Sequence, residues 1–215
     1  MILLYALNVG RMDREAIENN HTVYLERLAF YKQNGMDTTH DREMLFNAMG
    51  LSSEGERTIL EVGTGKGYFT LVLARKGFSI CSLDDSPEEQ YIARLNLAYD
   101  GLRASVNFVI GNAECLNFRP ESFDAVISCN TFHHLSHPVK AAEEALRVTK
   151  RGGRVMIADF SDVGFATIAA IHASEGKQHE MPAIRLHHIR DVFSAQGYRV
   201  SLSILGNEEL LIIRQ

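Results

Sequence analysis

Short apolar runs alternate with longer amphipathic segments from residue 58 onward, and this alternation constrains the fold more than any other feature. Each run has the length of a strand; the runs cover residues 58–62, 79–83, 106–110, 125–128 and 154–158. Helix-like segments lie between them, at 68–76, 87–99 and 138–149. The last helix begins at Pro138 and ends before Gly152-Gly153, as helix start and stop signals predict. Strands alternating with helices form βαβ units, so we predict a doubly wound, mostly parallel α/β sheet.

The two ends of the chain differ from this pattern. Residues 198–205 and 209–213 flank Gly206-Asn207, which predicts a β-hairpin and therefore an antiparallel last strand. With the five earlier runs this hairpin completes a seven-stranded sheet. Before residue 58, segments 13–33 and 41–49 are predicted to be helical, and we expect them to cap the sheet's edge rather than form a second domain.

Composition excludes several classes of protein. The net charge of −5 gives no general support for binding a phosphate backbone, which needs a basic face. No apolar run approaches the roughly 18–20 residues of a membrane span. The apolar start, residues 1–7, lacks the charged leading segment and cleavage site of a signal peptide, and Met12 leaves open that residues 1–11 are an extension. We predict a protein that binds neither nucleic acid nor membrane.

The cysteines and histidines do not have the spacing of a metal site. Cys81, Cys115 and Cys129 are odd in number and share no CxxC spacing, so we expect a reducing, cytoplasmic setting without a disulfide framework. His172 and His179 are seven residues apart, and no HExxH motif occurs. We therefore predict that the chain binds no metal.

A glycine-rich loop directly follows the first predicted strand and precedes a helix. Its sequence is Glu61-Val62-Gly63-Thr64-Gly65-Lys66-Gly67-Tyr68. Ligands of open α/β sheets bind at this position, where glycine lets backbone approach the ligand closely. A dinucleotide site needs its third glycine three residues after the second, but here it comes two residues later. The spacing therefore disfavours a pyrophosphate ligand.

Polar residues follow the next three predicted strands. Asp84 ends the second strand. A carboxylate there can accept hydrogen bonds from both ribose hydroxyls of a bound nucleoside, and the ribose of NAD offers the same hydroxyls. Asp85 follows it at the start of the next helix. After the third strand come Asn112 and Ala113, and after the fourth comes Asn130. Asp84 therefore supports a ligand that contains a ribose, but it does not identify the cofactor.

Over residues 55–160 this order of motifs resembles the class I S-adenosylmethionine-dependent methyltransferases, in particular the type 11 and ubiquinone/menaquinone methyltransferase groups. The resemblance implies a Rossmann-like fold and S-adenosylmethionine as cofactor, with S-adenosylhomocysteine as product. It implies that the glycine loop contacts the cofactor and that Glu61 steadies this loop. It also implies that Asp84 binds the ribose, that Asn112 and Ala113 bind the adenine, and that Asn130 lies by the methionine moiety. Asn112 departs from the family, which commonly has Asp there. The predicted cofactor-binding residues are Glu61, Gly63, Thr64, Gly65, Gly67, Asp84, Asp85, Asn112, Ala113 and Asn130.

We predict one domain over residues 1–215. It comprises a helical N-terminal cap (1–57), a cofactor-binding core (58–160), and a substrate-side insert followed by the C-terminal hairpin (161–215). Substrate selection is expected outside the motifs, in the leader at 31–40 and the insert at 159–185. The insert carries Phe160, Phe165, Ile168, Ile171, His172 and Met181, which either line an acceptor site or pack on the sheet.

The predicted function is methyl transfer to a small-molecule acceptor by in-line displacement, a reaction that needs positioning more than acid–base chemistry. His133 is the predicted base if one is used, because imidazole titrates near neutrality; a packing and capping role for His133-His134 stays open. Ser128-Cys129 and Asn130-Thr131-Phe132 lack the prolines of base-methylating motifs, which argues against a nucleic-acid acceptor. The alternatives are a non-catalytic S-adenosylmethionine-binding protein and a nicotinamide-dependent oxidoreductase. A homodimer is compatible with the sequence.

Overall fold

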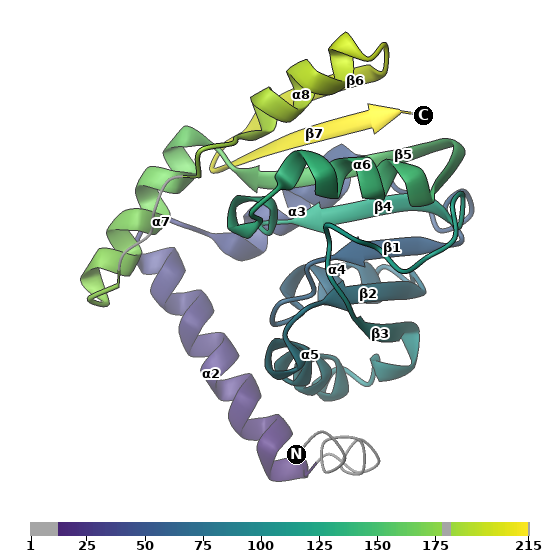
Figure 1. Cartoon of the computed structure of the whole chain (residues 1–215). Coiled ribbons are helices and arrows are strands. Elements are labelled where there is room, and N and C mark those ends of the chain that lie inside the picture. Colours follow the sequence, from purple (N-terminus) through teal and green to yellow (C-terminus); the bar gives the residue numbers. More distant parts are fainter. Residues whose placement is uncertain (1–12, 178–181, 215) are drawn as a thin grey trace.

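The computed structural model describes residues 13–177 and 182–214, and its strands form a seven-stranded sheet in the order β3-β2-β1-β4-β5-β7-β6 (Figure 1). The strands are β1 (Ile59–Val62), β2 (Ile80–Asp84), β3 (Val106–Ile110), β4 (Phe123–Cys129), β5 (Thr149–Phe160), β6 (Arg199–Leu205) and β7 (Glu208–Arg214). The first five pair in parallel, whereas β7 pairs antiparallel with β5 and β6. The predicted sheet, including its closing hairpin, is confirmed.

Helices cover both faces of this sheet. They are α4 (Tyr68–Arg75), α5 (Pro87–Tyr99), α6 (Pro138–Val148), α7 (Asp162–Ser174) and α8 (Leu186–Ala195), with short 3-10 turns η1 (Arg103–Ser105) and η2 (Phe132–His134). Alternate strand residues point to opposite faces, so one set packs with α6 and α8 and the other with α4 and the leader helix α3 (Thr38–Met49). Because both faces are covered, the strands read as continuous apolar runs.

The leader helix α2 (Arg14–Gln33) lies across the side of the molecule, with its first half beside α5 and its second half near α7 (Figure 1). Asn20 Nδ2 donates to Asn96 Oδ1 at 2.7 Å, and the His21 ring stacks on Tyr99 with 3.4 Å between centroids. Arg27 forms an ion pair with Glu175, at the end of α7. The leader is thus attached both to α5 and to the end of α7.

The structure differs from the sequence prediction at Gly152-Gly153. These glycines lie inside β5 rather than in a turn before it. Thr149 pairs with Phe123 and Arg154 pairs with Ala125, so the register shifts between them and the glycines form a bulge. A Cβ on Gly153 would lie 2.5 Å from the Asp124 carbonyl oxygen, which explains the glycine. The expectations for residues 1–11, His179 and Met181 fall outside the described residues.

Within residues 13–177 and 182–214, no helix combines the length and apolar character that crossing a bilayer requires.

Candidate active site

Four parallel strands, β1 to β4, end at the same edge of the sheet, and a cavity of about 640 Å³ opens there. Most of the predicted cofactor-binding residues line it: Gly63, Thr64, Gly65, Asp84, Asp85, Asn112, Ala113 and Asn130. Glu61 and Gly67 are not among the lining residues, and neither is His133. The cavity therefore brings together predicted residues from the ends of four different strands.

The three loop glycines have different physical roles. Gly63 (φ 87°) packs so closely against the Thr131 side chain that an added Cβ would clash with it. Gly67 (φ 74°) begins α4 and packs against Ala93, so it sets the approach of α4 to α5 rather than the cavity wall. Gly65 (φ 49°) faces open space, since no atom lies within 4 Å of the position that a Cβ would take. A ligand can therefore contact the backbone at Gly65.

Asp84 ties the glycine loop to the end of β2. Its Oδ2 accepts from the Gly65 backbone N–H at 2.7 Å, and its Oδ1 accepts from the Ser86 N–H at 2.9 Å. Each carboxylate oxygen can accept more than one hydrogen bond, so capacity remains for a pair of ligand hydroxyls. The exposed neighbour Asp85 also lines the cavity.

Glu61 lies beneath the loop instead of in the cavity. It is buried, and its Oε2 accepts from the hydroxyls of Thr70 and Ser82, both at 2.6 Å. Ser82 Oγ in turn lies 2.6 Å from Thr64 Oγ1, which connects this network to the loop. Burial raises the pKa of Glu61 to about 7. Its contacts are those of a residue that fixes the loop from below.

At the end of β3, the Asn112 side chain is held by its own turn. Asn112 Oδ1 accepts from the Glu114 N–H at 2.7 Å, an arrangement in which the oxygen keeps capacity for a second donor. Ala113 is buried next to it. Together they form the cavity wall at this strand end.

At the end of β4, Asn130 adopts a left-handed backbone conformation (φ 52°). Its Nδ2 donates to Oε1 of Glu208 at 3.1 Å, and its N–H donates to the Ala158 carbonyl at 2.9 Å. Glu208 begins β7 and is buried, and burial raises its pKa to about 8. The antiparallel hairpin thus supplies a carboxyl that holds a cavity-lining residue.

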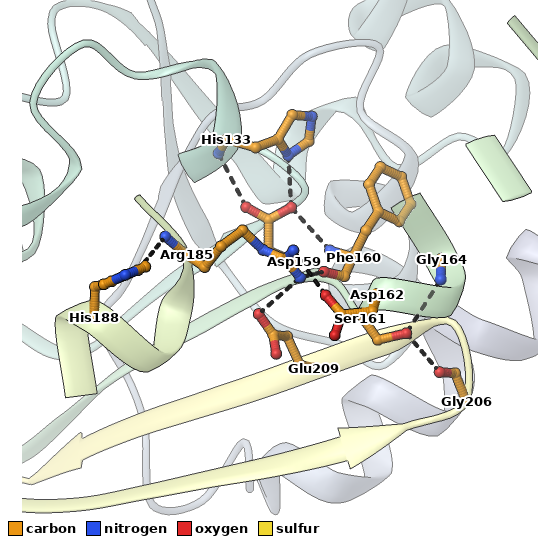
Figure 2. A network of polar contacts seen from close by, with 10 residues as sticks. All are labelled: His133, Asp159, Phe160, Ser161, Asp162, Gly164, Arg185, His188, Gly206 and Glu209. Atoms are coloured by element: carbon orange, nitrogen blue, oxygen red, sulfur yellow. Dashed lines mark hydrogen bonds and ion pairs between the residues drawn. The ribbon is translucent and has the colours of Figure 1, made fainter. Parts of the chain in front are cut away.

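His133 lies behind the cavity rather than in its lining. Its Nδ1 is 2.5 Å from Asp159 Oδ1, and its N–H donates to Asp159 Oδ2 at 3.0 Å, as Figure 2 shows. Both side chains are almost fully buried, with exposed fractions of 4% and 6%. The next residue, His134, is the histidine that lines the cavity.

The apolar residues of the insert do not line the cavity. Phe160, Phe165, Ile168 and Ile171 form a separate core with Met36 of the leader. The sequence is compatible with either packing or acceptor binding by this segment. In the structure, these apolar side chains are packed in the protein interior. The cavity instead receives residues that sequence reasoning did not assign: Arg42, Tyr68 and His134. Tyr68 and His134 lie in segments that follow strand ends, where ligand-binding residues are expected. Arg42 lies on a helix before the first strand, so no local sequence signal identifies it.

No cluster of three or more His, Cys, Asp or Glu side chains with the geometry of a metal site occurs in the described residues. Burial raises the pKa of Cys129 well above its usual range, which keeps that thiol protonated. The polar groups that line the cavity are backbone, carboxylate, amide, hydroxyl, imidazole, ammonium and guanidinium groups.

These groups suit a nucleoside ligand. The open space at Gly65 admits close backbone contact, Asp84 offers acceptors for ribose, and the walls at Asn112 and Ala113 can hold a base. A cavity of about 640 Å³ falls within the usual range for small-molecule sites.

Residues 60–157 match the family described as "Methyltransferase domain". A demethylmenaquinone methyltransferase of Renibacterium salmoninarum is 31% identical over 143 residues, which are 66% of this chain and 56% of that protein. An uncharacterized methyltransferase of Mycobacterium avium is 31% identical over 132 residues, which are 61% and 51% of the two chains. The chain thus spans about half the length of these curated relatives. A crystal structure of an S-adenosylmethionine-dependent methyltransferase from Aquifex aeolicus has a TM-score of 0.63 at 21% identity, covering 85% of this chain and 95% of that one.

Proposed function

We propose that this chain is a class I S-adenosylmethionine-dependent methyltransferase that transfers a methyl group to a small-molecule acceptor by in-line displacement. The observation that carries this proposal is the cavity at the ends of β1 to β4, within the segment that matches the family. Eight of the ten residues predicted to bind the cofactor line that cavity. We also propose that the described residues belong to one domain and that the protein acts in the cytoplasm.

Different residues of the chain would bind different parts of the cofactor. Gly63 and Gly65 offer backbone contact, Asp84 accepts from the ribose hydroxyls, Asn112 and Ala113 hold the adenine, and Asn130 lies beside the methionine end. The bound sulfonium supplies a methyl carbon already activated for nucleophilic attack. The protein's task is to hold the acceptor in line and exclude water. That task needs walls of fixed shape, and the buried networks of Glu61 and Glu208 provide such support.

For proton removal from the acceptor, His133 remains the proposed base. Asp159 fixes the orientation of its ring through the contact at Nδ1. Because His133 is buried behind the cavity, its action requires an acceptor that reaches past the exposed His134. Small acceptors satisfy this requirement better than polymers do. The net charge of −5 also supports a small acceptor over nucleic acid.

Isothermal titration calorimetry with S-adenosylhomocysteine tests the proposal. We expect micromolar affinity for the unmodified protein and a loss of roughly 10- to 100-fold in Asp84→Ala, the range for hydrogen bonds to a charged group. Asp84→Asn should retain part of the affinity, since an amide keeps one acceptor. Asp191→Ala, at an exposed aspartate on α8, serves as the matched control.

The two alternatives predict different results. Heat released with NADH but not with S-adenosylhomocysteine would indicate a nicotinamide-dependent oxidoreductase. Tight S-adenosylhomocysteine binding without product from a broad panel of small acceptors would indicate a non-catalytic binding protein. Absence of binding by either ligand would contradict the proposed function.

A further inference from the structure

Two polar side chains meet at the end of β4 and the start of β7, and each has one buried atom without a partner. Asn130 Nδ2 donates to Glu208 Oε1 at 3.1 Å. Asn130 Oδ1 and Glu208 Oε2 are buried, and neither has a hydrogen-bond partner in the part of the chain that the structure describes. Glu208 is only 4% exposed, so bulk water does not replace the missing partners. Because a buried polar atom without a hydrogen bond is costly, the two atoms call for a common explanation.

A single proton on Glu208 would give both atoms a partner. A carboxylic acid and a primary amide can join through two hydrogen bonds: the amide N–H donates to one carboxyl oxygen, and the acid O–H donates to the amide oxygen. Asn130 and Glu208 already form the first of these bonds. The two atoms that lack partners are those that the second bond would join. An ionised Glu208 would instead set two hydrogen-bond acceptors against each other.

The surroundings of Glu208 favour its neutral form. Burial raises its pKa to about 8, and the charges of Asp159 on β5 and Asp41 on α3 act in the same direction. Arg42, also on α3, opposes the shift without reversing it. Cys129, at the end of β4, adds no charge, because burial raises the pKa of its thiol well above the usual range. Glu208 therefore keeps its proton at neutral pH.

The position of Asn130 matters for the shape of the cavity. Its left-handed backbone conformation (φ 52°) is one that a residue other than glycine keeps only where its contacts fix it. The next residue, Thr131, fills the space beside Gly63 of the glycine loop, where an added Cβ would clash with it. Asn130 and Thr131 both line the cavity, whereas Glu208 does not. The contact with Glu208 thus holds the turn that lies against the glycine loop.

We propose that Glu208 is a positioning residue that, as a neutral acid, holds Asn130 through two hydrogen bonds and so keeps the cavity in its binding shape. The expected effect on S-adenosylmethionine binding rests on the proposed function. Loss of the proton removes one bond and brings two oxygens into repulsion, which releases the turn at Asn130 and Thr131. The cavity then binds its ligand more weakly, so affinity falls as pH rises through the pKa of Glu208. Glu208 lies on the C-terminal hairpin, outside residues 60–157 that match the family.

Calorimetry with S-adenosylhomocysteine at pH 6.5 and pH 9 tests this role. Glutamine has the donor and acceptor pattern of the neutral acid and cannot ionise, so Glu208→Gln should bind within about twofold of the unmodified protein at pH 6.5. At pH 9 about nine-tenths of Glu208 is ionised, and the unmodified protein should bind roughly 5- to 10-fold more weakly than Glu208→Gln. Titration of the ligand itself affects both proteins equally. The exposed control Glu54→Gln should follow the unmodified protein at both pH values.

A third variant separates hydrogen bonding from charge. Glu208→Met is neutral and similar in volume but cannot pair with the Asn130 amide. At pH 6.5 it should bind S-adenosylhomocysteine roughly 5- to 10-fold more weakly than Glu208→Gln. Equal affinity of these two variants would mean that the neutral charge alone matters, and it would overturn the proposed hydrogen-bonded pair.

A measurement without ligand, on the unmodified protein, distinguishes failure of this inference from failure of the proposed function. In a ¹³C NMR titration the Glu208 carboxyl signal should change with a midpoint of about 8, and the side-chain amide signals of Asn130 should shift with the same midpoint. A midpoint near the ordinary 4.5, or an Asn130 amide that does not respond, would overturn the pair. So would an equal pH dependence of S-adenosylhomocysteine affinity in the unmodified protein and Glu208→Gln. If the unmodified protein does not bind S-adenosylhomocysteine at either pH, the proposed function fails, and the NMR titration still decides whether the pair exists.

Discussion

Glu208 carries a buried carboxyl whose protonation contributes to the pH dependence of stability. Burial raises its pKa from 4.5 to about 8; Asp159 and Asp41 act in the same direction, while Asn130 and Arg42 oppose the shift. The native protein therefore binds more protons than the unfolded chain between these pH values, and the free energy of unfolding contributed by Glu208 falls as pH rises from about 4.5 to 8. We expect Glu208→Gln, which stays neutral, to remove this dependence. Urea unfolding at pH 5 and pH 8.5 measures it.

At each pH, the free energy of unfolding of Glu208→Gln is compared with that of the unmodified protein. Glu208→Gln should gain stability relative to the unmodified protein by at least about 1 kcal/mol on going to the higher pH, given 1.36 kcal/mol per unit of pKa. Glu54→Gln, at an exposed glutamate, should show no such gain. An equal pH dependence in all three proteins would mean that the Glu208 carboxyl ionises as freely as a surface group.

At the scale of elements, α7 is held by a small core of its own. Phe165 is 1% exposed and packs with Phe160, Ile168 and Met36. Phe165→Ala should lower the free energy of unfolding by about 3–5 kcal/mol through lost burial and the cavity left behind. Val163→Ala on the same helix should change it by less than about 0.5 kcal/mol, because Val163 is 64% exposed. Denaturant unfolding compares the two, and similar losses would contradict an independent core beneath α7.

The burial of α7 also illustrates which features local sequence signals do not predict. The strands and the glycine loop could be predicted because their signals are local: apolar runs of strand length, and a turn that only glycine permits at Gly63. The side on which Phe165 is buried depends on Met36, far away in the sequence, and periodicity does not specify that partner. Arg42 has the same limitation, since only the packing of α3 on the sheet brings it to Tyr68. The sequence does not separate His133 from His134, because the contact that holds the buried His133 ring comes from Asp159 of β5, far away in the sequence.

At the scale of the whole molecule, the cavity joins elements that lie far apart in sequence. Its lining comes from α3, the glycine loop, the starts of α4 and α5, the ends of β2, β3 and β4, and the segment between β4 and α6. An unfolded chain has no such site, so a ligand that fills it binds the native state alone and stabilises every element that forms it. The size of that stabilisation depends on ligand concentration relative to the dissociation constant.

At 100 times its dissociation constant, S-adenosylhomocysteine should add about 2.7 kcal/mol to the free energy of unfolding. For a chain of 215 residues this corresponds to a rise in Tm of roughly 5–10 °C in differential scanning calorimetry. NADH at the same concentration should leave Tm unchanged, because Tyr68 stands where a pyrophosphate-binding loop has its third glycine. Asp84→Ala should lose most of the shift at that fixed ligand concentration, since its weaker binding lowers the ratio of ligand to dissociation constant. A Tm that rises with NADH and not with S-adenosylhomocysteine would contradict the assignment of the cavity.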